Sequence, residues 1–283
     1  LHLMHRRILN VLLVATPYDS FMLEDDGRLE EQIYFEYTSL NLSSPPRFTQ
    51  VMNIAEALDA LNRKHYDLVI AMPGVDISVT FDRARETKRH HPDIAYVVLT
   101  PFSREVSRRL SKEDFTGVDF VFSWLGNVDL LVAIIQLLED FMNVENDVNN
   151  VGVQLIMLVE DSVRFYSSIL PTLYKFLLQQ SRDFSTEALN EHEQMMRMRG
   201  RPKVLLARNY EEAMDIYNRY GKHMMGVISD VSFMREGKKD SQAGLRLARQ
   251  LHQLDKNLPI IVESSEVKNA SLVAEFGGTF LEK

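Results

Sequence analysis

The sequence contains no cysteine among its 283 residues. This absence excludes disulfide bonds, thiol catalysis and thiolate metal sites, and it is compatible with a reducing compartment. No hydrophobic run approaches the roughly 20 residues that a membrane-spanning helix needs, and no signal peptide is visible. There is no long basic stripe, and the net charge of −8 argues against nucleic-acid binding. We therefore expect a soluble cytoplasmic protein with neither nucleic acid nor a membrane as its partner.

What the sequence does contain is an internal repeat. Hydrophobic residues make up 45% of the chain, which is enough for the cores of two domains. The segment Glu56–Arg63 (EALDALNR) matches Glu212–Arg219 (EAMDIYNR). Four more pairs match in the same order, namely 8–17 with 153–162, 67–73 with 226–232, 94–101 with 258–265, and 117–123 with 278–283. Five ordered matches indicate two copies of one unit.

Each copy alternates short strands with amphipathic helices, which predicts parallel sheets covered by helices on both faces. We expect strands at 8–15, 47–52, 67–72, 94–100 and 118–123, then at 153–159, 203–207, 225–230, 259–264 and 279–283. We expect helices at 18–38, 54–64 and 127–143, then at 162–180, 210–220, 242–254 and 266–276. The fold class is α/β, with two flavodoxin-like (βα)5 doubly wound domains of strand order 2-1-3-4-5, the second lacking its last helix in this chain. Their predicted bounds are 7–146 and 151–283, and the polar stretch 143–150 between them is interpreted as a boundary or a helical linker.

Several polar residues of the second copy fall where this topology places a binding site. In an open α/β sheet, ligands bind beyond the carboxyl ends of the strands, where the strand order reverses. The residues at those ends are Glu160, Asp161, Asp230, Ser264 and Lys283. Three carboxylates that share a cleft need a cation, and hard oxygen ligands suit Mg²⁺. An aspartate at such a metal can attack a phosphoryl group, while the lysine and the hydroxyl bind phosphate oxygens.

The second copy resembles the receiver domain of bacterial two-component response regulators over essentially its whole length. The matching motifs are VEDS after the first strand, ISDVS at the end of the third, IIVESS for the fourth and FLEK for the fifth. The resemblance implies that Asp230 is the phospho-acceptor. It also implies that Asp161 binds Mg²⁺ directly and that Glu160 acts through water.

The same resemblance assigns the rest of the site and its partners. The backbone carbonyl of Ser232 would complete the metal site, Ser264 would be the switch hydroxyl, and Lys283 would bind the phosphate. The phosphoryl donor would be a histidine kinase or phosphotransfer protein, and the domain would catalyse only its own phosphorylation and hydrolysis rather than act as an enzyme. A homodimer through a receiver face and a C-terminal effector outside this chain are left open.

Two other functions remain as alternatives. One is a Mg²⁺-dependent phosphohydrolase that uses Asp230 as its nucleophile. It ranks lower because haloacid-dehalogenase-like enzymes need an aspartate two residues after the nucleophile, where this chain has Ser232. The other is a non-phosphorylated scaffold module of a larger enzyme.

The first copy lacks the chemistry of the second. Its equivalent positions are Ala15, Thr16, Met72, Thr100 and Ser123. A thioether cannot accept a phosphoryl group stably, and no carboxylate remains to hold Mg²⁺. We therefore predict a pseudo-receiver that serves as an interaction or dimerisation unit.

Two segments of the second copy depart from the receiver pattern. The loop after Asp230 is longer than the first copy predicts and carries Arg235, Lys238 and Lys239. We interpret it as a solvated charged loop, with tuning of phosphate lifetime or partner choice as the alternative. The added segment 182–202 is expected to extend a helix that packs on its own domain, on the first copy or on a partner.

Overall fold

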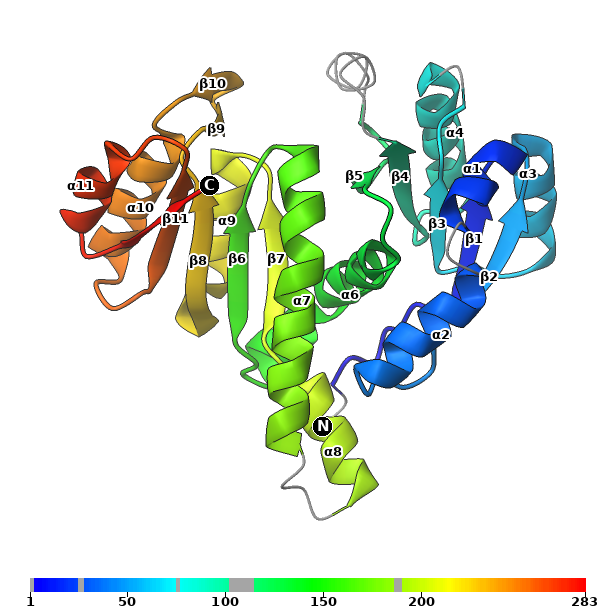
Figure 1. Cartoon of the computed structure of the whole chain (residues 1–283), viewed down its shortest axis with the longest axis horizontal. Helices are drawn as coiled ribbons and strands as arrows, with labels where there is room; N and C mark the ends of the chain where they lie inside the picture. The colour runs from blue at the N-terminus through cyan, green and yellow to red at the C-terminus, as the bar shows by residue number, and fades with distance from the viewer. Residues whose placement is uncertain (1–2, 25–27, 75–76, 102–114, 186–189) are drawn as a thin grey trace. The chain divides into compact units, whose positions relative to one another are not determined.

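The computed structural model describes residues 3–24, 28–74, 77–101, 115–185 and 190–283 (Figure 1). The chain divides into two compact units. The N-terminal unit comprises Arg6–Leu138 and Ser167–Gln179, and the C-terminal unit comprises Leu1–His5, Glu139–Tyr166 and Gln180–Lys283. Within the described residues, no helix is both long and apolar enough to cross a membrane.

The N-terminal unit is built on a five-stranded parallel sheet of order β2-β1-β3-β4-β5. Its strands are β1 (Asn10–Val14), β2 (Arg47–Val51), β3 (Leu68–Ala71), β4 (Ala95–Pro101) and β5 (Phe120–Trp124). Its helices are α1 (Pro17–Leu23), α2 (Leu29–Ser39), α3 (Ile54–Arg63), α4 (Ile77–His90), the first part of α6 (Asp129–Val144) and the middle of α7 (Val163–Ser185). The expected single helix over 18–38 is therefore two helices, and residues 25–27 lie outside the described residues.

The C-terminal unit has a second parallel sheet of order β7-β6-β8-β11-β12. Its strands are β6 (Leu155–Val159), β7 (Lys203–Ala207), β8 (Met224–Asp230), β11 (Ile260–Ser264) and β12 (Thr279–Glu282). Its helices are the end of α6, α8 (Glu191–Arg199), α9 (Tyr210–Tyr220), α10 (Ala243–Leu254), α11 (Asn269–Ala274), the two ends of α7 (Val163–Ser185), a π-helix (Glu145–Asn150) and a 3-10 turn (Gly221–His223). Both sheets have the order 2-1-3-4-5 when their strands are numbered within each copy. The predicted fold class is thus confirmed.

The repeat has a physical basis at the start of its best-matched helices. The side chain of Asn53 caps α3 by accepting a hydrogen bond from the backbone of Glu56 at 3.0 Å, and that of Asn209 caps α9 from Glu212 at 2.8 Å. Both glutamates reach back to the residue before the cap, at 2.9 Å and 2.7 Å. These reciprocal bonds satisfy backbone donors that a helix start otherwise leaves unpaired.

The segment after Asp230 differs from the expected solvated loop. It folds into a hairpin of β9 (Phe233–Arg235) and β10 (Lys238–Asp240). Its two-residue turn has positive φ at both Glu236 and Gly237, 53° and 73°, as a type I′ turn requires. Phe233 is fully buried in the core of the unit and anchors the hairpin to that core by packing.

The segment 182–202 is mostly helical. Helix α7 continues to Ser185, beyond the expected end at 180, and α8 adds a separate short helix that is capped by Asn190. Met198 of α8 is buried, which agrees with a packing role for that side chain, whereas Met195 of the same helix is exposed.

Four buried charges join the linker region to the start of β7. Arg201 donates two hydrogen bonds to Asp140, at 2.9 Å and 3.0 Å, and Lys203 lies 2.9 Å from Asp147 and 3.7 Å from Asp140. All four side chains are at most 1% exposed. Burial lowers the pKa of Lys203, although the two aspartates oppose that effect. Because the four charges balance, removal of any one would leave a buried charge without compensation.

Candidate metal centre

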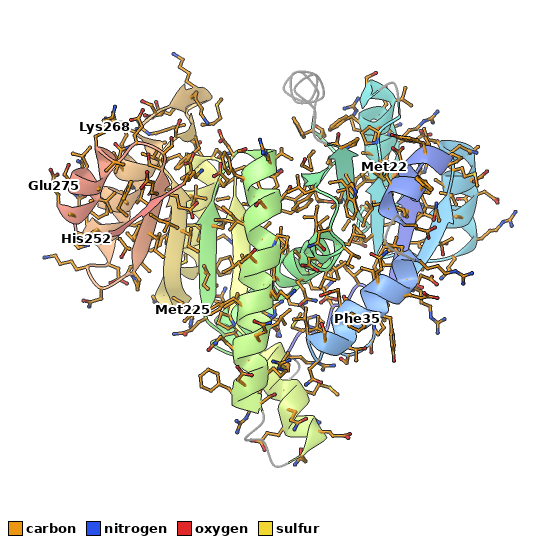
Figure 2. All side chains as sticks on the ribbon, viewed as in Figure 1. Met22, Phe35, Met225, His252, Lys268 and Glu275 are labelled. Atoms are coloured by element: carbon orange, nitrogen blue, oxygen red, sulfur yellow. The ribbon has the colours of Figure 1, made fainter. Side chains whose placement is uncertain are left out.

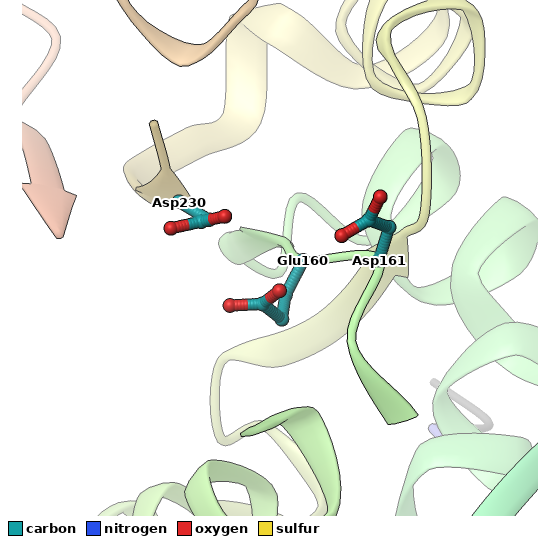
Figure 3. Close-up of side chains that lie close together, drawn as sticks. All are labelled: Glu160, Asp161 and Asp230. Carbon is teal, nitrogen blue, oxygen red and sulfur yellow. The ribbon is translucent and has the colours of Figure 1, made fainter. Parts of the chain in front are cut away.

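The parallel register gathers three acidic side chains at one edge of the second sheet. Glu160 and Asp161 follow β6 directly, and Asp230 is the last residue of the neighbouring strand β8, whose Ser229 pairs with Val159. Carboxylate oxygens of these three residues lie within 4.8 Å of one another (Figure 3). No other such cluster of acidic or histidine side chains occurs in the part of the chain that the structure describes.

Lys283 links two of these carboxylates. Its Nζ lies 2.8 Å from Oε2 of Glu160 and 2.9 Å from Oδ1 of Asp230. It also lies 4.1 Å from the centre of the Phe165 ring, within range of a cation–π contact. Burial lowers the pKa of Lys283, but the hydrogen bonds and charges of its two partners outweigh that effect and raise the pKa overall. The side chain is therefore held as a cation between two anions.

Glu160 is the buried member of the acidic cluster, with an exposure of 1%. Burial raises its pKa, the bond from Lys283 opposes this, and the charge of Asp230 adds to it. Its second oxygen accepts a hydrogen bond from the backbone of Ser162 at 3.0 Å. Glu160 is 1% exposed against 19% for Asp161 and 13% for Asp230, so it is the least accessible of the three and suits a supporting role better than direct contact with a ligand.

Asp161 faces a different lysine. The Nζ of Lys239, on strand β10 of the hairpin, lies 2.7 Å and 3.0 Å from the two oxygens of Asp161. The same ammonium donates to the backbone carbonyl of Ser232 at 2.9 Å. Asp161 and the Ser232 carbonyl, two of the expected metal ligands, therefore already share one cation.

Ser264 lies at the end of β11 and is 1% exposed. Its Oγ accepts hydrogen bonds from the backbone of Glu266 at 3.0 Å and from the side-chain amide of Asn269 at 2.9 Å. Because the oxygen accepts both bonds, its own hydrogen can be donated elsewhere. Ser264 lines a cavity of about 620 Å³ together with Asp161, Asp230 and Lys283.

Two further residues shape the site and were not predicted from the sequence. Glu263 pairs in register with Asp230, and burial together with the charge of Asp230 raises its pKa, while Lys283 opposes that rise. Gly244, in the first turn of α10, packs so closely that an added Cβ would lie 2.0 Å from the carbonyl oxygen of Asp230. Its backbone donates to Val231 at 2.9 Å. Only a residue without a side chain allows α10 to pack this closely against the backbone of Asp230 and Val231.

The donor set fits a hard divalent cation. Carboxylate and carbonyl oxygens with room for water are the ligands that Mg²⁺ takes. Two of these groups, the Asp161 carboxylate and the Ser232 carbonyl, already bind the ammonium of Lys239. The equivalent positions of the N-terminal unit offer nothing comparable. Ala15 and Met72 are buried there and line an apolar cavity of about 270 Å³.

Comparisons with known proteins add little to this geometry. No protein-family model and no curated protein matches the sequence. Two solved structures described as two-component system response regulator/GGDEF domain proteins are each 14% identical, with a TM-score of 0.36, over 97% of this chain and 91% of theirs. The structure of GsuK bound to ADP is also 14% identical, with a TM-score of 0.27, over 99% of this chain and 66% of its own. These TM-scores are too low to support a conclusion about function.

Proposed function

We propose that the C-terminal unit is a receiver-type signalling module whose Asp230 accepts a phosphoryl group in a Mg²⁺-dependent step. The observation that carries the proposal is the convergence of Glu160, Asp161 and Asp230 within 4.8 Å, with Lys283 bridging Glu160 and Asp230. The strongest alternative explanation, a merely structural cluster of charges, leaves the adjacent cavity unused.

The chemistry follows from the positions of the side chains. An Asp230 oxygen attacks the phosphorus of a phosphohistidine or acetyl phosphate, and the bond from phosphorus to the donor atom breaks as the new bond forms. The donor leaves with the bonding electrons, so no oxidant or reductant is needed. Lys283 pairs with a phosphoryl oxygen, and the Ser264 hydroxyl donates to another.

Asp161, Asp230 and the Ser232 carbonyl would hold Mg²⁺, with Glu160 acting through a water molecule. The bound ion supplies charge neutralisation of the incoming phosphate oxygens. Water would later attack the same phosphorus and restore the Asp230 carboxylate. The unit would thereby return to its starting state without a separate phosphatase.

The N-terminal unit would serve as an interaction surface. Four aromatic side chains of α1 and α2 are more than half exposed, namely Tyr18, Phe21, Tyr34 and Phe35. Figure 2 labels Phe35 on α2 and Met22, which is 41% exposed, on α1. Contiguous exposed apolar patches mark sites of protein association, and these side chains are the candidates for such a patch in this unit. A histidine kinase or phosphotransfer protein, or a second receiver, would be the partner.

The test is adduct formation on the full chain. Beryllofluoride or acetyl phosphate with Mg²⁺ should give a one-to-one adduct, detected by ¹⁹F NMR or intact mass, and Asp230→Asn should abolish it. Asp215→Asn, on the exposed face of α9, is the matched control and should retain the adduct. No adduct on the unmodified protein would refute the proposal. Rapid catalytic release of phosphate, with no trapped intermediate, would favour the phosphohydrolase instead.

A further inference from the structure

The β9–β10 hairpin delivers a cation into the proposed metal site. Lys239 makes three charge-assisted contacts of 2.7 to 3.0 Å, two to Asp161 and one to the Ser232 carbonyl. Its neighbour Lys238, on the same strand, is exposed and has no ion pair among the residues that the structure describes. The two adjacent lysines therefore differ in their contacts, although their charge and side-chain length are the same.

The hairpin that carries Lys239 is fixed at several points. Phe233 is fully buried in the core, and Met234 forms an isolated bridge with Asn209. The backbone of Glu236 donates to Glu211 at 2.9 Å, which fastens the turn to α9. Cross-strand pairing of Lys239 with Met234 then sets the direction of the lysine side chain. The backbone is held, and the flexible four-carbon side chain is the part that can move.

We propose that Lys239 is a built-in competitor of the divalent cation, which must displace its ammonium group from Asp161 and the Ser232 carbonyl. This inference rests on the metal site of the proposed function. Lys239 and Mg²⁺ would use the same oxygen atoms, and an ammonium within 3 Å of those oxygens repels a second cation there.

The balance of charge points the same way. Two lysines, Lys239 and Lys283, face three carboxylates, so the site without metal is close to neutral. A divalent ion added while both lysines stay in place would make the site cationic. Displacement of Lys239 removes one positive charge from the site. Its ammonium remains near the cavity that it lines, where a phosphoryl group would arrive.

Lys239 therefore weakens metal binding, and metal binding releases the lysine. In Lys239→Met, the apolar side chain keeps most of the length but no longer competes. The affinity for Mn²⁺, used as a spectroscopic substitute for Mg²⁺ and measured by electron paramagnetic resonance on the full chain, should rise about fivefold, as expected for an ion pair whose lysine is 54% exposed. Lys238→Met removes the same charge from the same strand and should change the affinity less than twofold.

A second measurement reports the lysine itself. Reductive ¹³C-dimethylation keeps the positive charge of each lysine, and Lys239→Arg identifies the Lys239 signal by its disappearance. Addition of Mg²⁺ should shift that signal toward the position of an exposed lysine, with no comparable shift for Lys238. Both readouts are independent of phosphorylation, so they remain interpretable even where Asp230 forms no adduct.

Each outcome decides the inference. Tighter Mn²⁺ binding in Lys239→Met alone, with a moving Lys239 signal, supports it. Equal affinities in the unmodified protein and Lys239→Met, equal gains in the two methionine variants, or weaker binding in Lys239→Met would overturn it. If neither the unmodified protein nor Lys239→Met binds Mn²⁺, both the competition and the metal site are wrong. The beryllofluoride experiment separately tests the acceptor role of Asp230.

Discussion

The Nζ of Lys283 and the Oε2 of Glu160 lie 2.8 Å apart, with side-chain exposures of 15% and 1%. The two residues are 123 positions apart in the sequence, and the contact joins the end of β12 to the end of β6. Figure 1 shows the C terminus at the same edge of the sheet as the β9–β10 hairpin. The contact matters for stability as well as for the proposed chemistry.

Substitution of Lys283 should destabilise the C-terminal unit. Lys283→Met leaves the buried Glu160 without its cation, and we expect a loss of about 1–3 kcal/mol in the free energy of unfolding at neutral pH. The loss should shrink in acid, where Glu160 takes up a proton. Urea titrations at neutral pH and in acid measure the loss of stability under each condition. Lys268→Met, at an exposed ion pair with Glu266, should stay close to the unmodified protein.

Glu263 should make stability depend on pH. Its pKa is raised above the ordinary value of 4.5 when the protein is folded, so the folded state holds its proton to higher pH than the unfolded chain. The stabilisation from that proton is complete below 4.5 and is lost as pH rises through the raised pKa. Without metal, stability should therefore decline less steeply from pH 4.5 to neutral pH in Glu263→Gln. Equal slopes would show that Glu263 is not involved.

Gly244 should not tolerate even a methyl group. Alanine favours helices by about 1 kcal/mol over glycine, yet its Cβ would collide with the Asp230 carbonyl at 2.0 Å and with Val231 at 2.8 Å. We expect Gly244→Ala to lose several kcal/mol of stability and to displace Asp230, seen as loss of the beryllofluoride adduct. Gly226→Ala, on the same strand as Asp230, meets nothing closer than 3.5 Å and is the matched control. Similar behaviour of the two variants would contradict the assigned role.

The buried charges near the linker should be far more costly to disturb than exposed ones. Asp140→Asn leaves Arg201 buried without a counter-charge, with an expected loss of about 3–5 kcal/mol. Asp59→Asn breaks the exposed pair with Arg63 and should change stability by less than about 1 kcal/mol. Chemical denaturation of the full chain measures both losses of stability. Hydrogen exchange of the backbone amides of β7, measured separately, shows whether the loss in Asp140→Asn arises in the C-terminal unit. A loss of stability in Asp140→Asn as small as that in Asp59→Asn would show that the buried network does not stabilise the protein.

The sheets and the acidic edge could be predicted because they depend on local patterns. β-branched runs and Asn-capped helices recur in both copies, and residues that end parallel strands meet at one edge. The contacts of Lys239 could not be predicted, because they depend on where the chain turns at Glu236 and Gly237. The exclusion of a side chain at Gly244 depends on the approach of α10 to β8. Such distances come from packing between segments that the sequence pattern treats separately.

The network of Asp140, Asp147, Arg201 and Lys203 limits how this protein can be dissected. A shortened chain that starts at 151 would keep the two buried cations and discard both anions that balance them. The same applies to recombination, since a chimera joined at that point would separate Arg201 and Lys203 from the two aspartates that pair with them. A self-sufficient C-terminal module must therefore include the residues from Glu139 onward.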